Sequence, residues 1–84
     1  MDENMSELKT DILIAAVKYA SDGRDFKLSN IAIQLPNVPL EVIKSALPTL
    51  APPGFIQIVS PQAAGKYRLN LKNTVVAGLI RELN

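Results

Sequence analysis

Two basic residues near the end of the sequence stand where they could bind an anion. Lys66 and Arg68 flank Tyr67 in the segment GKYRL, and the earlier segment GFIQI shows a similar alternation of apolar and polar residues. Because successive side chains of a β-strand point to opposite faces, this pattern predicts a hairpin with Tyr67 on the core face and both cations facing outward. Such cations would bind a partner outside the chain, or would protect an exposed sheet edge from pairing with other chains.

The basic residues are concentrated in the later part of the chain. The net charge is +1, but residues 1–25 carry six acidic and three basic side chains, whereas residues 26–84 carry six basic and two acidic ones. A basic region suits an anionic partner, because neutralising phosphates releases counterions and favours binding. Six cations over this length also fit an ordinary solvated surface, so the charge pattern leaves both interpretations open.

The composition excludes several classes of function. The sequence has no cysteine and no histidine, so thiolate or imidazole metal sites and nucleophiles activated by histidine are impossible. It also lacks a phosphate-binding glycine-rich motif, and we expect neither enzymatic activity nor a cofactor. The longest apolar run, residues 12–17, is far shorter than the roughly 20 residues of a membrane-spanning helix. We therefore expect a cytoplasmic protein without a membrane segment.

The spacing of apolar residues, prolines and glycines predicts one domain over residues 1–84. Helices are expected over residues 5–21, 29–35, 39–50 and 71–83, and a short strand over residues 26–28. Asn4 is expected to cap the first helix and Ser29 the second. Pro48 should kink or end the third helix, because proline removes one helical hydrogen bond and clashes with the preceding turn. Tyr19 lies on the apolar stripe of the first helix and is expected in the core.

Three segments in this order carry a resemblance to a known family. LSNIAIQLPNVP predicts a short helix and a turn, VIKSALPTLAPPGFI a helix with paired leucines before a glycine and an apolar strand, and GKYRL a return strand. Together they resemble the winged helix-turn-helix domain of prokaryotic (bacterial, archaeal or viral) transcription regulators. The resemblance covers residues 28–69, about half of the chain. It implies a mostly α-helical fold with a small β-hairpin, the wing.

The resemblance also implies how the chain would bind double-stranded DNA. In this family the third helix enters the major groove and the wing contacts the backbone. Glu41 would repel phosphate unless it accepted a hydrogen bond from cytosine, and no arginine lies on the helix to read guanine. Ser29 would either contact a phosphate or serve only as a helix cap. The residues expected to contact DNA are Lys27, Ser29, Asn30, Leu40, Lys44, Ser45, Lys66 and Arg68.

The last helix carries more apolar surface than a single packing stripe requires. This excess predicts a homodimer formed through residues 71–84, although both faces of the helix could instead be covered within one subunit. The expected interface residues are Leu71, Val75, Val76, Leu79, Ile80 and Leu83. A second hypothesis for the whole chain is a winged-helix module that binds a protein partner in a larger assembly, because Leu40, Glu41 and Pro48 give the third helix an apolar and acidic surface.

Overall fold

The structure is a computed structural model that describes residues 3–60 and 65–83 of the chain. These residues form four α-helices, a short 3-10 helix and a three-stranded antiparallel sheet. The helices are α1 (Glu3–Ala20), α2 (Leu28–Ala32), α3 (Leu40–Ala46), η1 (Leu47–Leu50, the 3-10 helix) and α4 (Thr74–Leu83), and the strands are β1 (Asp25–Lys27), β2 (Ile56–Ser60) and β3 (Lys66–Leu69). The predicted mixture of helices with a small hairpin is therefore confirmed at this coarse level.

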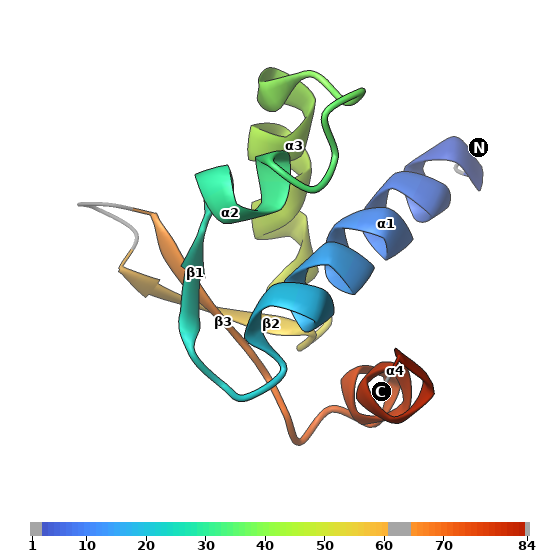
Figure 1. Cartoon of the computed structure of the whole chain (residues 1–84), viewed down its shortest axis with the longest axis vertical. Helices are drawn as coiled ribbons and strands as arrows, with labels where there is room; N and C mark the ends of the chain where they lie inside the picture. Colours follow the sequence, from blue (N-terminus) through green and yellow to red (C-terminus); the bar gives the residue numbers. More distant parts are fainter. Residues whose placement is uncertain (1–2, 61–64, 84) are drawn as a thin grey trace.

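Helix α1 is the element around which the others pack. It lies between α2 and α3 on one side and α4 on the other, and it also contacts β1 and β3 (Figure 1). Apolar residues around much of its circumference are consequently buried: Ile12, Leu13, Ala15, Ala16, Val17 and Ala20. The broad apolar stripe that the sequence shows is thus explained by neighbours within the same chain.

Two predictions about α1 are wrong. The helix begins at Glu3, so Asn4 lies inside the helix and is not its N-cap. Tyr19 is 38% exposed and does not belong to the core. The predicted end of the helix is confirmed at Gly23, whose φ of 91° suits glycine and whose N–H donates to the carbonyl of Ala20 at 3.0 Å.

The sheet adds β1 to the predicted hairpin, with β3 in the centre. On the core face, Phe26 of β1 stands opposite Tyr67 of β3, and Tyr67 stands opposite Ile58 of β2. The Phe26 and Tyr67 rings stack with their centroids 5.9 Å apart. Because Phe26 is only 1% exposed, this row joins the short strand β1 to the hairpin and to the helices beneath it.

The second and third helices are shorter than the sequence predicts. Ser29 is the second residue of α2 and not its cap, whereas Asn30 accepts a hydrogen bond from the backbone N–H of Lys27 at 2.8 Å. The effect predicted for Pro48 is confirmed: α3 ends at Ala46 and the chain continues as η1. The residues of this segment that face the core are Ile43, Ala46, Leu47 and Leu50.

Helix α4 begins at Thr74, three residues later than predicted. Asn73 sets this boundary, because its side-chain oxygen accepts hydrogen bonds from the N–H groups of Val75 at 2.9 Å and Val76 at 3.2 Å. Val76 is fully buried against α1 and the rest of the core. Within the described ranges, the helices are too short or too polar to cross a membrane.

We predict that Phe26→Ala lowers the free energy of unfolding by about 3–5 kcal/mol, because it removes the largest buried side chain of the sheet and leaves a cavity. Urea denaturation followed by circular dichroism measures this loss. Ile33→Ala is a matched control, since Ile33 is 77% exposed and its truncation should change stability by no more than about 0.5 kcal/mol. A loss below about 1 kcal/mol for Phe26→Ala would contradict the central position given to this ring.

Candidate nucleic-acid interface

The sheet turns its charged side chains away from the core. Asp25 stands opposite Arg68 and Lys27 opposite Lys66 across β1 and β3, while Gln57 of β2 stands opposite Arg68. Residues directly opposite in an antiparallel pair point to the same face, and the intervening Phe26 and Tyr67 point inward. The outward-facing residues Asp25, Lys27, Gln57, Lys66 and Arg68 form what we call the outer sheet face. The predicted outward direction of Lys66 and Arg68 is confirmed, and Lys27, which the resemblance alone suggested, joins them.

Lys27 and Lys66 place two positive charges directly opposite each other. Side chains in such pairs have Cβ atoms about 5 Å apart, and like charges there are unfavourable. Both residues are exposed, and neither forms an ion pair with a carboxylate of residues 7–59 and 65–83. The stacking of Phe26 and Tyr67 on the other face fixes this register, so the two lysines stay opposite each other.

Arg68 differs from the two lysines because it already has an anionic partner. Its Nε donates to Oδ1 of Asp25 at 2.8 Å, in an ion pair whose side chains are 48% and 34% exposed. The pairing of β1 with β3 creates this contact between residues 43 positions apart. Arg68 therefore points outward as predicted, but its charge is partly neutralised by a residue that the sequence analysis did not single out.

A polar hollow of about 400 Å³ lies beside the two lysines. The end of α1, strand β1, the start of α2 and the start of β3 each contribute to it. Its lining residues are Tyr19, Asp25, Lys27, Ser29, Asn30 and Lys66. The structure thus brings together Lys27, Ser29, Asn30 and Lys66 of the predicted DNA-contacting residues. Their side chains can donate hydrogen bonds to a phosphate.

Tyr19 is the residue of this hollow that the sequence analysis placed wrongly. The guanidinium of Arg24 lies 5.7 Å from the centre of its ring, and Arg24 in turn pairs with Asp22 at 3.0 Å. Hydrogen bonds from Arg24 hold the pKa of the Asp22 carboxyl below its usual range. This pair therefore persists as the pH falls toward the usual pKa of an aspartate and is lost only in stronger acid. Tyr19 lies in the last turn of α1, close to the turn at Gly23. This position near a helix end was the sequence signal that could have placed Tyr19 at the surface.

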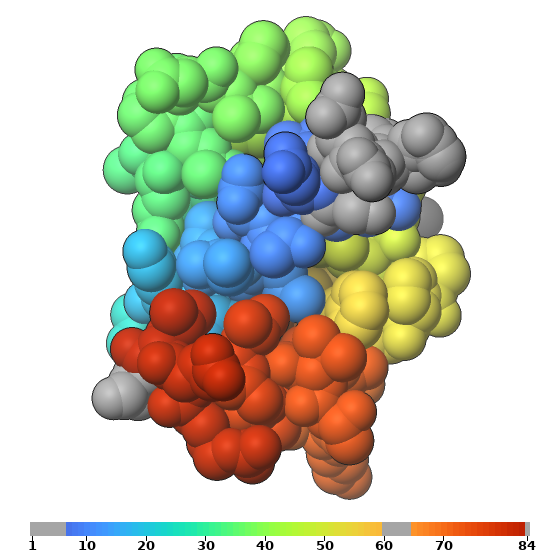
Figure 2. Space-filling view, turned by 90° about the vertical axis from the view of Figure 1, so that its right-hand side faces the viewer, coloured from blue at the N-terminus to red at the C-terminus, as the bar shows by residue number. Residues whose placement is uncertain are grey.

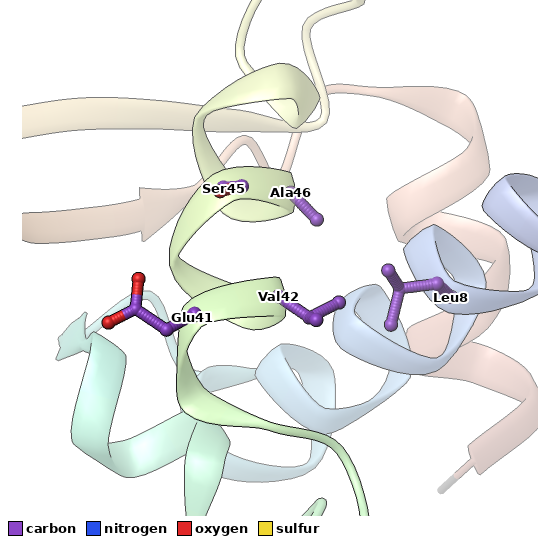
Figure 3. A pocket seen from close by; sticks show the side chains of 5 residues that line it. All are labelled: Leu8, Glu41, Val42, Ser45 and Ala46. Carbon is purple, nitrogen blue, oxygen red and sulfur yellow. The ribbon is translucent and has the colours of Figure 1, made fainter.

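The predicted DNA-contacting residues of α3 lie outside this hollow. Leu40, Lys44 and Ser45 are exposed, as is Glu41. Leu40 and Lys44 are four residues apart, as are Glu41 and Ser45, so each pair lies on one side of the helix. Glu41 and Ser45 border a second hollow, of about 330 Å³, whose apolar wall is Leu8 of α1 with Val42 and Ala46. In Figure 3, Leu8 and Val42 point toward each other, whereas Glu41 points away. The exposed side of α3 is close to neutral, because Glu41 and Lys44 carry opposite charges. The outer sheet face, in contrast, carries three basic side chains and one acidic one.

Helix α4 lies beside α1 at one end of the molecule (Figure 2). Leu71, Val75 and Leu83 are 42%, 50% and 41% exposed. Leu79 and Ile80 are half-buried against the core, and Val76 is fully buried. The prediction of Val76 as an interface residue is corrected by this burial, because packing inside the chain leaves it no surface to offer a second subunit. Residue Gly78 borders a shallow hollow between Val75 and Arg81.

In the part of the chain that the structure describes, acidic side chains do not gather in groups of three or more that could hold a metal ion. Comparison with known proteins gives no further guide: no protein-family model, no curated protein and no solved structure matches this chain. The assignment of a function therefore depends on the geometry of the outer sheet face.

We predict that Lys27 and Lys66 destabilise each other in the free protein. A double-mutant cycle with Lys27→Gln and Lys66→Gln should give an unfavourable coupling of about 0.2–1 kcal/mol, measured by urea denaturation at low salt. The coupling should disappear near 1 M salt, where the screening length falls to about 3 Å. Additive effects of the two substitutions at low salt would show that the side chains avoid each other.

Proposed function

We propose that this chain is a small DNA-binding protein of the winged-helix type that acts as a transcription regulator in the cytoplasm. The observation that supports the proposal most directly is the opposition of Lys27 and Lys66 on the outer sheet face. Their mutual repulsion raises the free energy of the unbound protein. A phosphate between the two lysines relieves this repulsion, which favours binding. Ser29 and Asn30 border the same hollow and add donors beside the lysines.

In this proposal the sheet and α3 have different tasks. The hairpin formed by β2 and β3 is the wing, and with β1 it holds the DNA backbone. Contacts of this kind position a protein on DNA without selecting a sequence. Helix α3 enters the major groove, where Lys44 donates to a guanine edge or a phosphate and Ser45 to either. Because Leu40 and Glu41 provide few polar contacts, the sequence preference should be modest.

In this proposal the protein forms a homodimer through α4. Val75 and Leu83 lie on that helix with half of their side-chain surface exposed or nearly so, and Leu71 precedes them. Gly78 has no atom within 4 Å of the position that a Cβ would occupy, so a side chain of a second subunit can approach its backbone closely. A two-fold dimer would present two outer sheet faces to paired half-sites on DNA.

One observation favours a second function, a winged-helix module that binds a protein partner. Ile33 and Leu40 are 77% and 52% exposed and flank the connection between α2 and α3, and Val42 is 39% exposed. Apolar side chains at these positions are unfavourable in water and would be covered by an apolar partner. The DNA-binding experiment separates the two proposals, since only the first requires the lysines.

We predict that labelled random-sequence duplex DNA binds this protein at about 50 mM salt, and that affinity falls steeply at about 200 mM. The Lys27→Gln/Lys66→Gln variant should bind all sequences more weakly and lose about two units of the slope of log K against log salt, because two phosphate contacts are removed. Fluorescence anisotropy measures both quantities.

The matched control for this experiment is Lys18→Gln/Lys72→Gln, which removes the same charge from exposed positions on α1 and before α4. It should leave affinity within about threefold of the parent, through long-range electrostatics alone. Equal losses in the two double variants would contradict the assignment to the sheet face. Absence of binding at about 50 mM salt would favour the protein-binding module.

A separate prediction concerns the dimer. Val75→Asp should convert the protein to a monomer, because burying an unpaired carboxylate in an apolar interface is strongly unfavourable. Light scattering coupled to size-exclusion chromatography gives the mass directly. Ile33→Asp introduces the same charge at an apolar residue outside α4 that is more exposed than Val75, 77% against 50%, and should leave the mass unchanged. A monomeric parent protein at micromolar concentration would refute the dimer.

A further inference from the structure

The ion pair between Asp25 and Arg68 lies on the same face as Lys27 and Lys66. Its Nε–Oδ1 distance is 2.8 Å, and both side chains are partly exposed. Ion pairs in such surroundings are weak, because water screens them and two flexible side chains must be held in place. A phosphate that approaches the outer sheet face can therefore exchange with the carboxylate of Asp25 for the guanidinium of Arg68.

Strand geometry makes Arg68 a natural third contact for a nucleic-acid backbone. It lies two residues after Lys66 on β3, so the two side chains leave the same face about 7 Å apart along the strand. Arginine also binds a phosphate better than lysine does, since its planar group offers two parallel donors. Without Asp25 the face would present a cluster of three cations: Lys27, Lys66 and Arg68.

Asp25 interferes with this cluster in two ways. It occupies Arg68, and it also borders the hollow that contains Lys27 and Lys66, where its negative charge repels a phosphate. We propose that Asp25 is an intramolecular competitor of DNA, which withholds Arg68 from the phosphate backbone and so sets the strength and the salt dependence of binding. This inference rests on the proposed DNA-binding function and identifies the residue that regulates it.

The consequence is a face that holds DNA through two phosphate contacts although it contains three cations. If Arg68 leaves Asp25 for a phosphate, the carboxylate is left unpaired next to the negatively charged backbone. If Arg68 stays with Asp25, it contributes no contact of its own. Either way, the net gain from Arg68 is small while Asp25 is ionised. Replacing Asp25 by a neutral residue of the same shape removes both obstacles.

The test compares Asp25→Asn with the parent in the duplex DNA titration at several salt concentrations. We expect affinity at about 50 mM salt to rise several-fold and the slope of log K against log salt to steepen by about one unit, because one phosphate contact is gained. Asp22→Asn is the matched control: it also frees an arginine, Arg24, from an exposed ion pair, but in the turn after α1. It should raise affinity less than twofold and leave the slope unchanged.

The variant Asp25→Asn/Arg68→Gln decides the mechanism. If Asp25 acts by withholding Arg68, the double variant returns to the slope of the parent and loses most of the affinity that Asp25→Asn gained. If it keeps the gain of Asp25→Asn, the carboxylate acts only by repulsion and the inference is overturned. It is equally overturned if Asp25→Asn behaves like Asp22→Asn while the parent binds DNA with steep salt dependence, a result that leaves the proposed function intact. Absence of binding by all variants would overturn both. Thermal melting confirms that each variant is folded.

Discussion

The contact between Phe26 and Tyr67 is the interaction on which the rest of this structure depends. Strand β1 has three residues, too few to be stable alone, and it is held in place by burying Phe26 between the sheet and the helices. Phe26 faces the core opposite Tyr67. Because successive side chains of a strand point to opposite faces, the residues on either side of Phe26 point outward. Asp25 and Lys27 must face outward, opposite Arg68 and Lys66. The repulsive lysine pair and the ion pair are therefore the outer consequence of an apolar contact on the inner face.

The sheet and α3 differ in the charge of the side chains that they expose. The sheet gathers cations beside polar side chains in a concave surface, whereas the exposed side of α3 combines one acidic, one basic and one apolar residue with a serine: Glu41, Lys44, Leu40 and Ser45. A surface of the first kind contributes affinity that depends on salt, and one of the second kind contributes little discrimination between bases. In the proposed function, binding strength thus comes mainly from the sheet, and α3 adjusts the position.

The sequence predicted the elements whose signals are local. Alternation in GFIQI and GKYRL gave the hairpin and the direction of its cations, Gly23 gave the end of α1, and Pro48 gave the end of α3. Helix starts were predicted less well, because several residues near each start are able to cap it. At the start of α2, Asn30 accepts a backbone hydrogen bond, whereas Ser29 was the expected cap. At the start of α4, Asn73 accepts such a bond, and the sequence analysis names no cap there. The pairing of β1 with β3 was beyond local reasoning, since it joins residues about 40 positions apart, and the contact of Arg68 with Asp25 is missed with it.

The turn between α1 and β1 has an evolutionary consequence. Ala20 and Phe26 are both buried, and Gly23 closes the segment between them with a φ of 91°. Inserting or deleting one residue there would rotate Phe26 to the solvent and Lys27 into the core, because a slip of one position exchanges the two faces of a strand. Related genes should therefore conserve the length of this segment more strictly than its composition. Substitutions at the outer positions, by contrast, can change the charge of the sheet without disturbing the core. In the proposed function, the affinity for DNA can therefore evolve independently of the fold.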